Sequence, residues 1–221
     1  MSCGRWLPRN EDNMSKARFS LIAGILALGF WFYQFSTQDG GNFGLQFRYL
    51  TVWGLSFAVV AHYLLWRARA RGSSYPAAFV TATAVLNIMV MFLYWRLYFI
   101  DPKLVNGENT PVWFQEYYLH LLGPVLIIAD ALFLSRSFTN ILRGAAATLS
   151  TCLAYIAWSE IFVGPLNDKP VGTVTSGLPY PFLNDMNIMG RAGFYGTTLA
   201  TALVFFAICY GIVALQRRLL R

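Results

Sequence analysis

The chain has 221 residues, of which 57% are hydrophobic and 12% are charged, and its mean hydropathy is +0.48. A composition this apolar excludes an ordinary soluble domain and is typical of an integral membrane protein. The net charge of +7 does not indicate nucleic-acid binding, because Lys and Arg cluster at the ends of apolar segments rather than along one polar face. We therefore expect membrane lipids, and no nucleic acid, as partners.

Six apolar segments follow one another along the chain, and each is long enough to cross a bilayer, which takes about 20 mainly apolar residues. They span 18–36, 47–66, 76–100, 111–134, 140–163 and 191–215. The sequence therefore predicts an all-α bundle of about six transmembrane helices over residues 18–216. An N-terminal segment, 1–17, precedes the bundle and a basic tail, 217–221, follows it.

Positive charge marks every second connection between these segments. The N-terminal segment, the turns around 67–71 and 136–143 and the tail are basic, which predicts that both termini are cytoplasmic in a cell membrane or endomembrane. The first apolar segment lacks a small-residue cleavage site, so we interpret it as retained rather than as a signal peptide. Cys3, Cys152 and Cys209 have no paired spacing, and the sequence predicts neither a disulfide nor a metal site nor a cofactor.

Ionisable residues inside a span are candidates for function because charge in hydrocarbon is costly. The second and fourth spans run in the same direction, which places Thr51 and His120 at similar depths near the outer face. Glu116 precedes His120 by one helical turn. The third and fifth spans run in the opposite direction, which places Arg96 and Glu160 near the same outer face of the membrane. We therefore expect one cavity that opens outward and is lined by Thr51, Arg96, Glu116, His120 and Glu160.

A second polar level is expected nearer the inner face. His62 follows Thr51 by eleven residues, and Asp130 follows His120 by ten, so each step covers roughly 15 to 17 Å of helix. His62 and Asp130 are therefore expected to meet. Asn87, on the third span, is a further polar residue that we expect to support the site.

A hydroxyl, an imidazole and a carboxylate are the parts of nucleophilic acyl transfer, in which the imidazole takes the hydroxyl proton and the acid fixes its tautomer. A guanidinium such as that of Arg96 suits a substrate carboxylate or a developing negative charge. The residues alone leave other interpretations open. Thr51 also fits a helix cap, Arg96 fits a side chain that reaches the membrane surface, and His62 with Asp130 fits a helix contact.

Four stretches carry a family resemblance: FRYLT at 47–51, FLYWRLYFIDPKLVNGENTPVWFQEYYLH at 92–120, PVLIIAD at 124–130 and YPFL at 180–183. In their order and spacing they resemble the androgen-induced membrane protein family, whose members are threonine hydrolases that cleave fatty acid esters of hydroxy fatty acids. The resemblance implies that Thr51 is the nucleophile and His120 the base. It also shows one departure. Family members have an Asn-His-x-Met-His run ending at the catalytic histidine, where this chain has Glu116 four residues before His120.

The expected function is therefore that of an intramembrane lipid ester hydrolase of the type that cleaves fatty acid esters of hydroxy fatty acids, with a lipid ester or fatty acid as its substrate. The alternative is a non-catalytic membrane protein that binds or moves a lipid-like ligand in the same cavity. A third hypothesis, an ion or proton pathway through His62 and Asp130, has less support because the bundle is small and has no internal repeat.

Overall fold

The computed structural model describes residues 11–37, 41–106, 111–167 and 177–220, which form helices and their connections and include no β-strand. The long helices are α1 (Glu11–Thr37), α2 (Leu50–Arg71), α3 (Ala77–Ile100), α7 (Ile141–Ala157) and α10 (Ile188–Leu219). One further rod is assembled from α5 (Trp113–Tyr117), η2 (Tyr118–Leu122), α6 (Gly123–Ala129) and η3 (Asp130–Leu134). The shorter elements are η1 (Leu45–Arg48), α4 (Lys103–Asn106), η4 (Trp158–Val163), α8 (Gly164–Leu166) and α9 (Pro181–Asn184).

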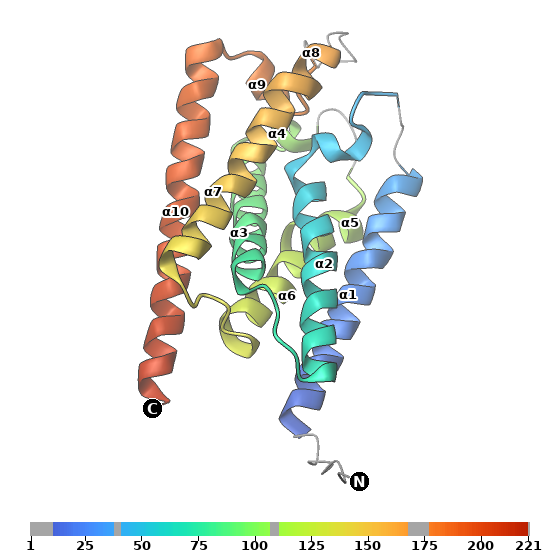
Figure 1. Cartoon of the computed structure of the whole chain (residues 1–221). Coiled ribbons are helices and arrows are strands. Elements are labelled where there is room, and N and C mark those ends of the chain that lie inside the picture. Colours follow the sequence, from blue (N-terminus) through green and yellow to red (C-terminus); the bar gives the residue numbers. More distant parts are fainter. Residues whose placement is uncertain (1–10, 38–40, 107–110, 168–176, 221) are drawn as a thin grey trace, which may run out of the picture.

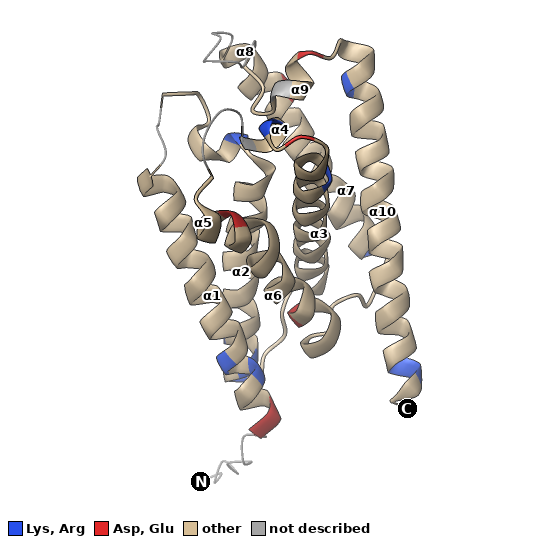
Figure 2. Ribbon diagram, turned by 180° about the vertical axis from the view of Figure 1, so that it is seen from behind, with Lys and Arg blue, Asp and Glu red and all other residues tan. Residues whose placement is uncertain are grey.

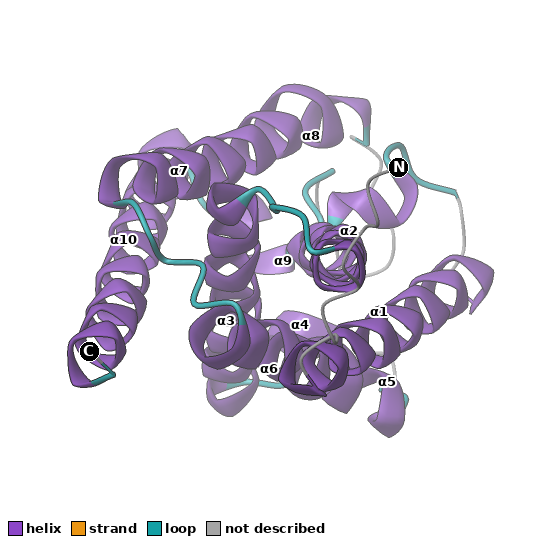
Figure 3. Cartoon of the chain, turned by 60° about the horizontal axis from the view of Figure 1, so that its bottom comes forward, coloured by secondary structure: helices purple, strands orange, loops and turns teal. Residues whose placement is uncertain are grey.

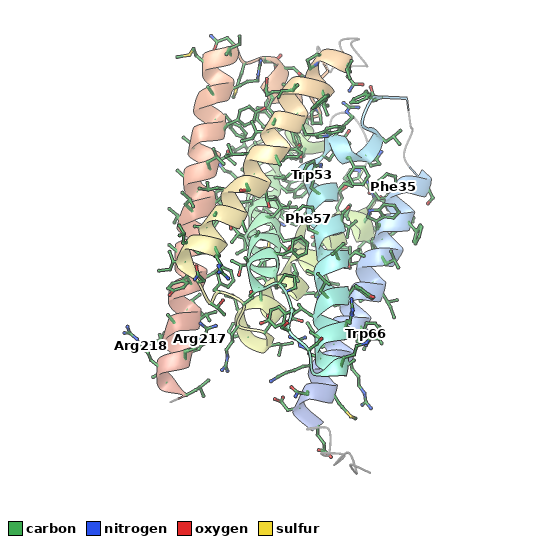
Figure 4. The ribbon with its side chains drawn as sticks, in the orientation of Figure 1. Phe35, Trp53, Phe57, Trp66, Arg217 and Arg218 are labelled. Atoms are coloured by element: carbon green, nitrogen blue, oxygen red, sulfur yellow. The ribbon has the colours of Figure 1, made fainter. Side chains whose placement is uncertain are left out.

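The rods run lengthwise, and the start of α1 and the end of α10 lie at the same end of the bundle (Figure 1). We call this the terminal end and the opposite one the distal end. Arg217 and Arg218 lie at the terminal end, as does Trp66 near the end of α2 (Figure 4). The shared position of both described chain ends fits an even number of passes, while the cytoplasmic side of that end stays a prediction.

Within the described residues five helical segments are long and apolar enough to cross a membrane, so the protein is an integral multi-pass membrane protein. They are α1, α3, Trp113–Leu134, Ile141–Leu166 and α10. The expected second span corresponds to α2, which packs against α1 and α3 but is not among the five. The hydropathy of α2 is lowered by its sequence, which contains the buried His62 and has arginines in its last turns. A sixth crossing therefore remains a prediction.

Helix α3 lies at the centre of the bundle and contacts α2, α6, α7 and α10 (Figure 3). In its most apolar stretch 67% of the residues are buried, against 22% in α1 and in α10. A helix that is apolar on all sides is suited to such a position. Alanine and threonine at 81–84 of α3 let neighbouring helices approach closely.

At both ends of the bundle the helices extend beyond the spans expected from the sequence. Helix α1 begins at Glu11, so residues 11–17 of the expected N-terminal segment continue the first helix. Glu11 and Asp12 suit the positive end of the helix dipole, and Lys16 lies 2.6 Å from Asp12. At the other end α10 extends to Leu219, so most of the basic tail is helical. Residues 1–10 and 221 lie outside the described part.

Three π-helical turns interrupt the rods, and each contains one of the ionisable residues singled out from the sequence. His120 is in η2, Asp130 is in η3 and Glu160 is in η4. A π-turn adds one residue to a helical turn and so redirects the side chains around it, and such turns are frequent at functional sites. Hydrophobic periodicity alone did not predict them.

Candidate active site

The structure brings Thr51 and His120 together in the distal half of the bundle. Thr51 is the second residue of α2, and its Oγ1 lies 3.2 Å from Nε2 of His120 in η2. His120 is only 8% exposed, whereas Thr51 is half-buried. A hydroxyl at this distance from an imidazole nitrogen is within reach of proton transfer.

The other ring nitrogen of His120 faces an acid. Its Nδ1 lies 3.0 Å from Oε2 of Glu116, one helical turn earlier. The two atoms are close enough for an ion pair, although they are not aligned for a hydrogen bond. Glu116 is the acidic residue of α5, the element that carries the red of Asp and Glu in Figure 2.

Aromatic side chains of α3 fix the position of the imidazole. The ring of Tyr94 stacks on that of His120, with centroids 3.6 Å apart and planes 5° from parallel. The indole Nε1 of Trp95 donates a hydrogen bond of 2.9 Å to the carbonyl oxygen of His120. Neither aromatic residue was predicted from the sequence to belong to the site.

The backbone carbonyl oxygen of His120 can accept the hydrogen bond from Trp95 because residue 124 is a proline. In a regular helix the N–H four residues later would bond to it, but proline has no N–H. Gly123 instead donates to Tyr118, five residues back, which closes the π-turn. A second Gly-Pro pair, at 164–165, follows the π-turn that contains Glu160. A Gly-Pro pair inside an apolar span is therefore the sequence signal that marks both turns.

The segment before Thr51 is held by its backbone. The carbonyl oxygen of Phe47 accepts a hydrogen bond of 3.0 Å from each of the indoles of Trp53 and Trp158. The carbonyl oxygen of Arg48 accepts one of 2.8 Å from the hydroxyl of Tyr155. These bonds fix the chain where it enters α2.

Tyr180 completes this arrangement from a distant part of the chain. Its hydroxyl accepts a hydrogen bond of 3.1 Å from the N–H of Leu50, which as the first residue of α2 has no acceptor within the helix. Burial raises the pKa of the Tyr180 phenol to about 12, so the group stays neutral. The YPFL stretch thus contacts the FRYLT stretch directly.

The structure does not bring the remaining outer residues to this pair. Arg96 is exposed, because it lies two residues after Tyr94, or roughly 200° around the helix from the side that contacts His120. Glu160 binds Arg191, at 2.9 Å, and Tyr195, at 2.7 Å, and so joins η4 to α10. Of the five residues expected to line one cavity, Thr51, His120 and Glu116 are the three that the structure brings together.

Asn87 has a structural role in the buried centre. Its side-chain nitrogen donates to the carbonyl oxygens of Gly54, at 3.1 Å, and Thr83, at 2.9 Å. It thereby ties α3 to α2 a short distance below Thr51. Asn87 also lines a small enclosed cavity together with His62 and Tyr118, with room for about one water molecule.

At the terminal end Asp130 pairs with Arg69 rather than with His62. Two nitrogens of Arg69 lie 2.8 and 2.6 Å from the carboxylate, which also accepts a bond of 2.9 Å from Ser20. A guanidinium offers a carboxylate two parallel charged bonds, which an imidazole does not. Arg69 also donates to the backbone oxygen of Lys16, at 3.1 Å, and to the Ser20 hydroxyl.

His62 is 1% exposed, and its Nδ1 has no hydrogen-bond partner within the described residues. Sequence reasoning assigned Arg69 to a cytoplasmic turn. Its position seven residues after His62, two helical turns along the same face of α2, was the signal for an inward orientation.

Fold and site together define a multi-pass helical membrane protein with a threonine–histidine–glutamate cluster in its distal half. The chain belongs to the FAR-17a/AIG1-like protein family, whose model matches residues 16–214. This confirms the androgen-induced family indicated by the four sequence stretches. Comparison with curated proteins and with solved structures gave no match. Membership of this family is consistent with a membrane hydrolase.

Proposed function

We propose that the protein is an intramembrane hydrolase of lipid esters, of the kind formed between a fatty acid and a hydroxy fatty acid. Thr51 is the nucleophile and His120 the general base. The observation that carries this proposal is the double contact of one imidazole. Its Nε2 is 3.2 Å from the Thr51 hydroxyl, and its Nδ1 is 3.0 Å from the Glu116 carboxylate.

In the first step Oγ1 of Thr51 attacks the ester carbonyl carbon while its proton passes to Nε2 of His120. The tetrahedral intermediate then expels the alcohol, which takes the proton from Nε2 and leaves an acyl group on Thr51. Water enters, gives its proton to Nε2 and attacks the acyl carbon. Release of the carboxylic acid restores the Thr51 hydroxyl, with His120 acting as base and then acid in each half.

Glu116 has the position of the orienting acid in this scheme. Facing Nδ1, a carboxylate favours the tautomer with the proton on Nδ1, which leaves Nε2 free to accept from Thr51. It also stabilises the imidazolium formed after each proton transfer. Because the family pattern has a neutral amide at this position, we infer that this chain holds its imidazole by charge as well as by the Tyr94 stack.

The proposal is tested by ester hydrolysis with the purified full chain in lipid nanodiscs. Thr51→Ala and His120→Ala are expected to lower turnover by roughly 10³-fold, while Thr51→Ser, which keeps a hydroxyl, retains part of it. Thr197→Ala, an exposed threonine on α10, is the matched control. A folded Thr51→Ala protein with undiminished turnover would falsify the assignment.

Covalent labelling separates catalysis from lipid binding. A fluorophosphonate probe is expected to modify Thr51 in the wild type and to leave the Thr51→Ala protein unlabelled. Lipid binding without any adduct on Thr51 would favour the non-catalytic alternative. A pH-dependent ion flux in liposomes without hydrolysis would instead favour a pathway through the bundle.

A further inference from the structure

Arg48 is a buried arginine that has no counter-ion among the described residues. It ends η1, three residues before Thr51, and is 7% exposed. Its Nε is enclosed and has no hydrogen-bond partner, and within the described residues no acceptor bonds to any nitrogen of its guanidinium. Its backbone carbonyl oxygen accepts the hydrogen bond from Tyr155.

No described acid is paired with it. Glu116 faces His120, and Glu160 is held by Arg191 and Tyr195. The described contact of the guanidinium is with the ring of Tyr49, whose centroid is 5.7 Å from its central carbon. An aromatic face stabilises a cation by less free energy than a paired anion does. Burying a charge without a partner costs free energy. The geometry therefore points to an anion that binds here.

An apolar hollow lies beside this cation. It has a volume of about 420 Å³, is open to the surroundings and is lined by Phe43, Gly44, Leu45, Phe47, Trp53 and Trp158. Its volume is within the range of sites for small ligands. In Figure 4 Trp53 is seen on α2 in the distal half of the bundle.

Gly44 connects the hollow to the stem of Arg48. A Cβ at residue 44 would lie 3.1 Å from the Trp158 ring and 3.2 Å from Cγ of Arg48, and the residue has a φ of +82° that favours glycine. The arginine stem and the indole thus pack against the same small residue. The stem of Arg48 therefore lies next to Gly44, which itself lines the hollow.

We propose that Arg48 and this hollow bind an amphiphile with a free carboxylate, with the carboxylate on the guanidinium and the hydrocarbon chain against the aromatic side chains. The planar guanidinium matches a carboxylate in two parallel hydrogen bonds. This inference rests on the proposed function and makes it more specific. The carboxylate-bearing end of substrate or product is recognised by Arg48, and not by Arg96, which is exposed on the other side of α3.

The test measures binding of palmitate and of methyl palmitate to Thr51→Ala protein in nanodiscs of neutral phosphatidylcholine, so that hydrolysis does not contribute. Palmitate is expected to bind more tightly than its methyl ester. Arg48→Gln is expected to weaken palmitate binding at least about tenfold, as loss of a charge-assisted bond does, and to leave methyl palmitate unchanged. Arg96→Gln, an arginine change at an exposed position, is the matched control and should change neither affinity.

Equal affinity of the Thr51→Ala protein for palmitate and methyl palmitate would overturn the proposal, even if Arg48→Gln fails to fold. Unchanged palmitate binding in a folded Arg48→Gln protein would also overturn it, as would a loss in Arg96→Gln equal to that in Arg48→Gln. Tighter binding of dodecyl phosphate than of dodecanoate would assign the site to phosphate instead. Because binding is measured without Thr51, failure of the hydrolase proposal and failure of this one are distinguishable.

Discussion

The rings of Tyr94 and His120 lie face to face, 3.6 Å apart and 5° from parallel, at the contact between α3 and η2. This stack holds the imidazole edge-on between Thr51 and Glu116. Since proton transfer depends on the direction of Nε2, the orientation of His120 is set by a helix to which it does not belong.

Replacement of Tyr94 tests this orientation. Tyr94→Leu removes the stacking face and is expected to lower kcat about tenfold or more, since small displacements of a catalytic group are costly. Tyr94→Phe keeps the ring and loses only the hydroxyl, so its loss should be smaller. Steady-state ester hydrolysis measures both. Equal losses in the two variants would show that the hydroxyl, and not the stack, is what matters.

Glu116 is expected to act on kcat rather than on substrate binding. Glu116→Gln keeps the size of the side chain and removes its charge, and we expect kcat to fall about tenfold or more with KM nearly unchanged, because the imidazolium loses its stabilising partner. The kcat and KM of the purified variant measure this. A variant with full kcat would remove Glu116 from the catalytic set and leave Thr51 with His120.

Pro124 is expected to matter for activity more than for folding. In Pro124→Ala a backbone N–H becomes available to the His120 carbonyl and competes with the indole of Trp95. The π-turn should then relax toward a regular helix and move the imidazole away from Thr51. We expect lower turnover with a thermal midpoint equal to or above that of the wild type. A fall in thermal midpoint with unchanged turnover would contradict this role.

The buried pair of Arg69 and Asp130 is expected to stabilise the terminal end. Asp130→Leu or Arg69→Leu alone leaves one buried charge without a partner and should cost about 3 to 5 kcal/mol. The double substitution removes both charges and should recover most of that loss. Unfolding of the purified protein in detergent measures all three. Simple additivity of the two single losses would show that the groups do not stabilise each other.

Gly144 is expected to set the distance between α7 and α10. A Cβ at this residue would lie 2.7 Å from Cε2 of Phe206, so Gly144→Ala forces the ring to move and should cost about 1 to 3 kcal/mol. Phe206→Leu in the same chain shortens the opposing side chain and should restore part of the stability. Gly193→Ala, where nothing lies within 4 Å, serves as the control. Unfolding in detergent compares the variants.

The sequence predicted more of the fold than of the site. Runs of apolar residues and the placement of Arg and Lys are local properties, and they located the helical rods to within a few residues, except at the two ends of the bundle. The contact between Thr51 and His120 was predicted from their equal depth in two spans that run in the same direction. This argument works because the rise per residue of a helix is nearly constant. The same argument was too coarse for Arg96, since depth does not fix the face of the helix on which a residue lies.

The class of protein, the family and the threonine–histidine pair were thus determined by the sequence itself, through composition, helical spacing and four short motifs. Only the tertiary structure decided which partners the ionisable groups take. Glu160 turns to α10, Asp130 turns to Arg69, and Arg48 is left buried beside an aromatic hollow. The physical reason is that pairing of charges depends on distances of a few ångström between helices, and the π-turns that set these distances leave no hydrophobic period in the sequence.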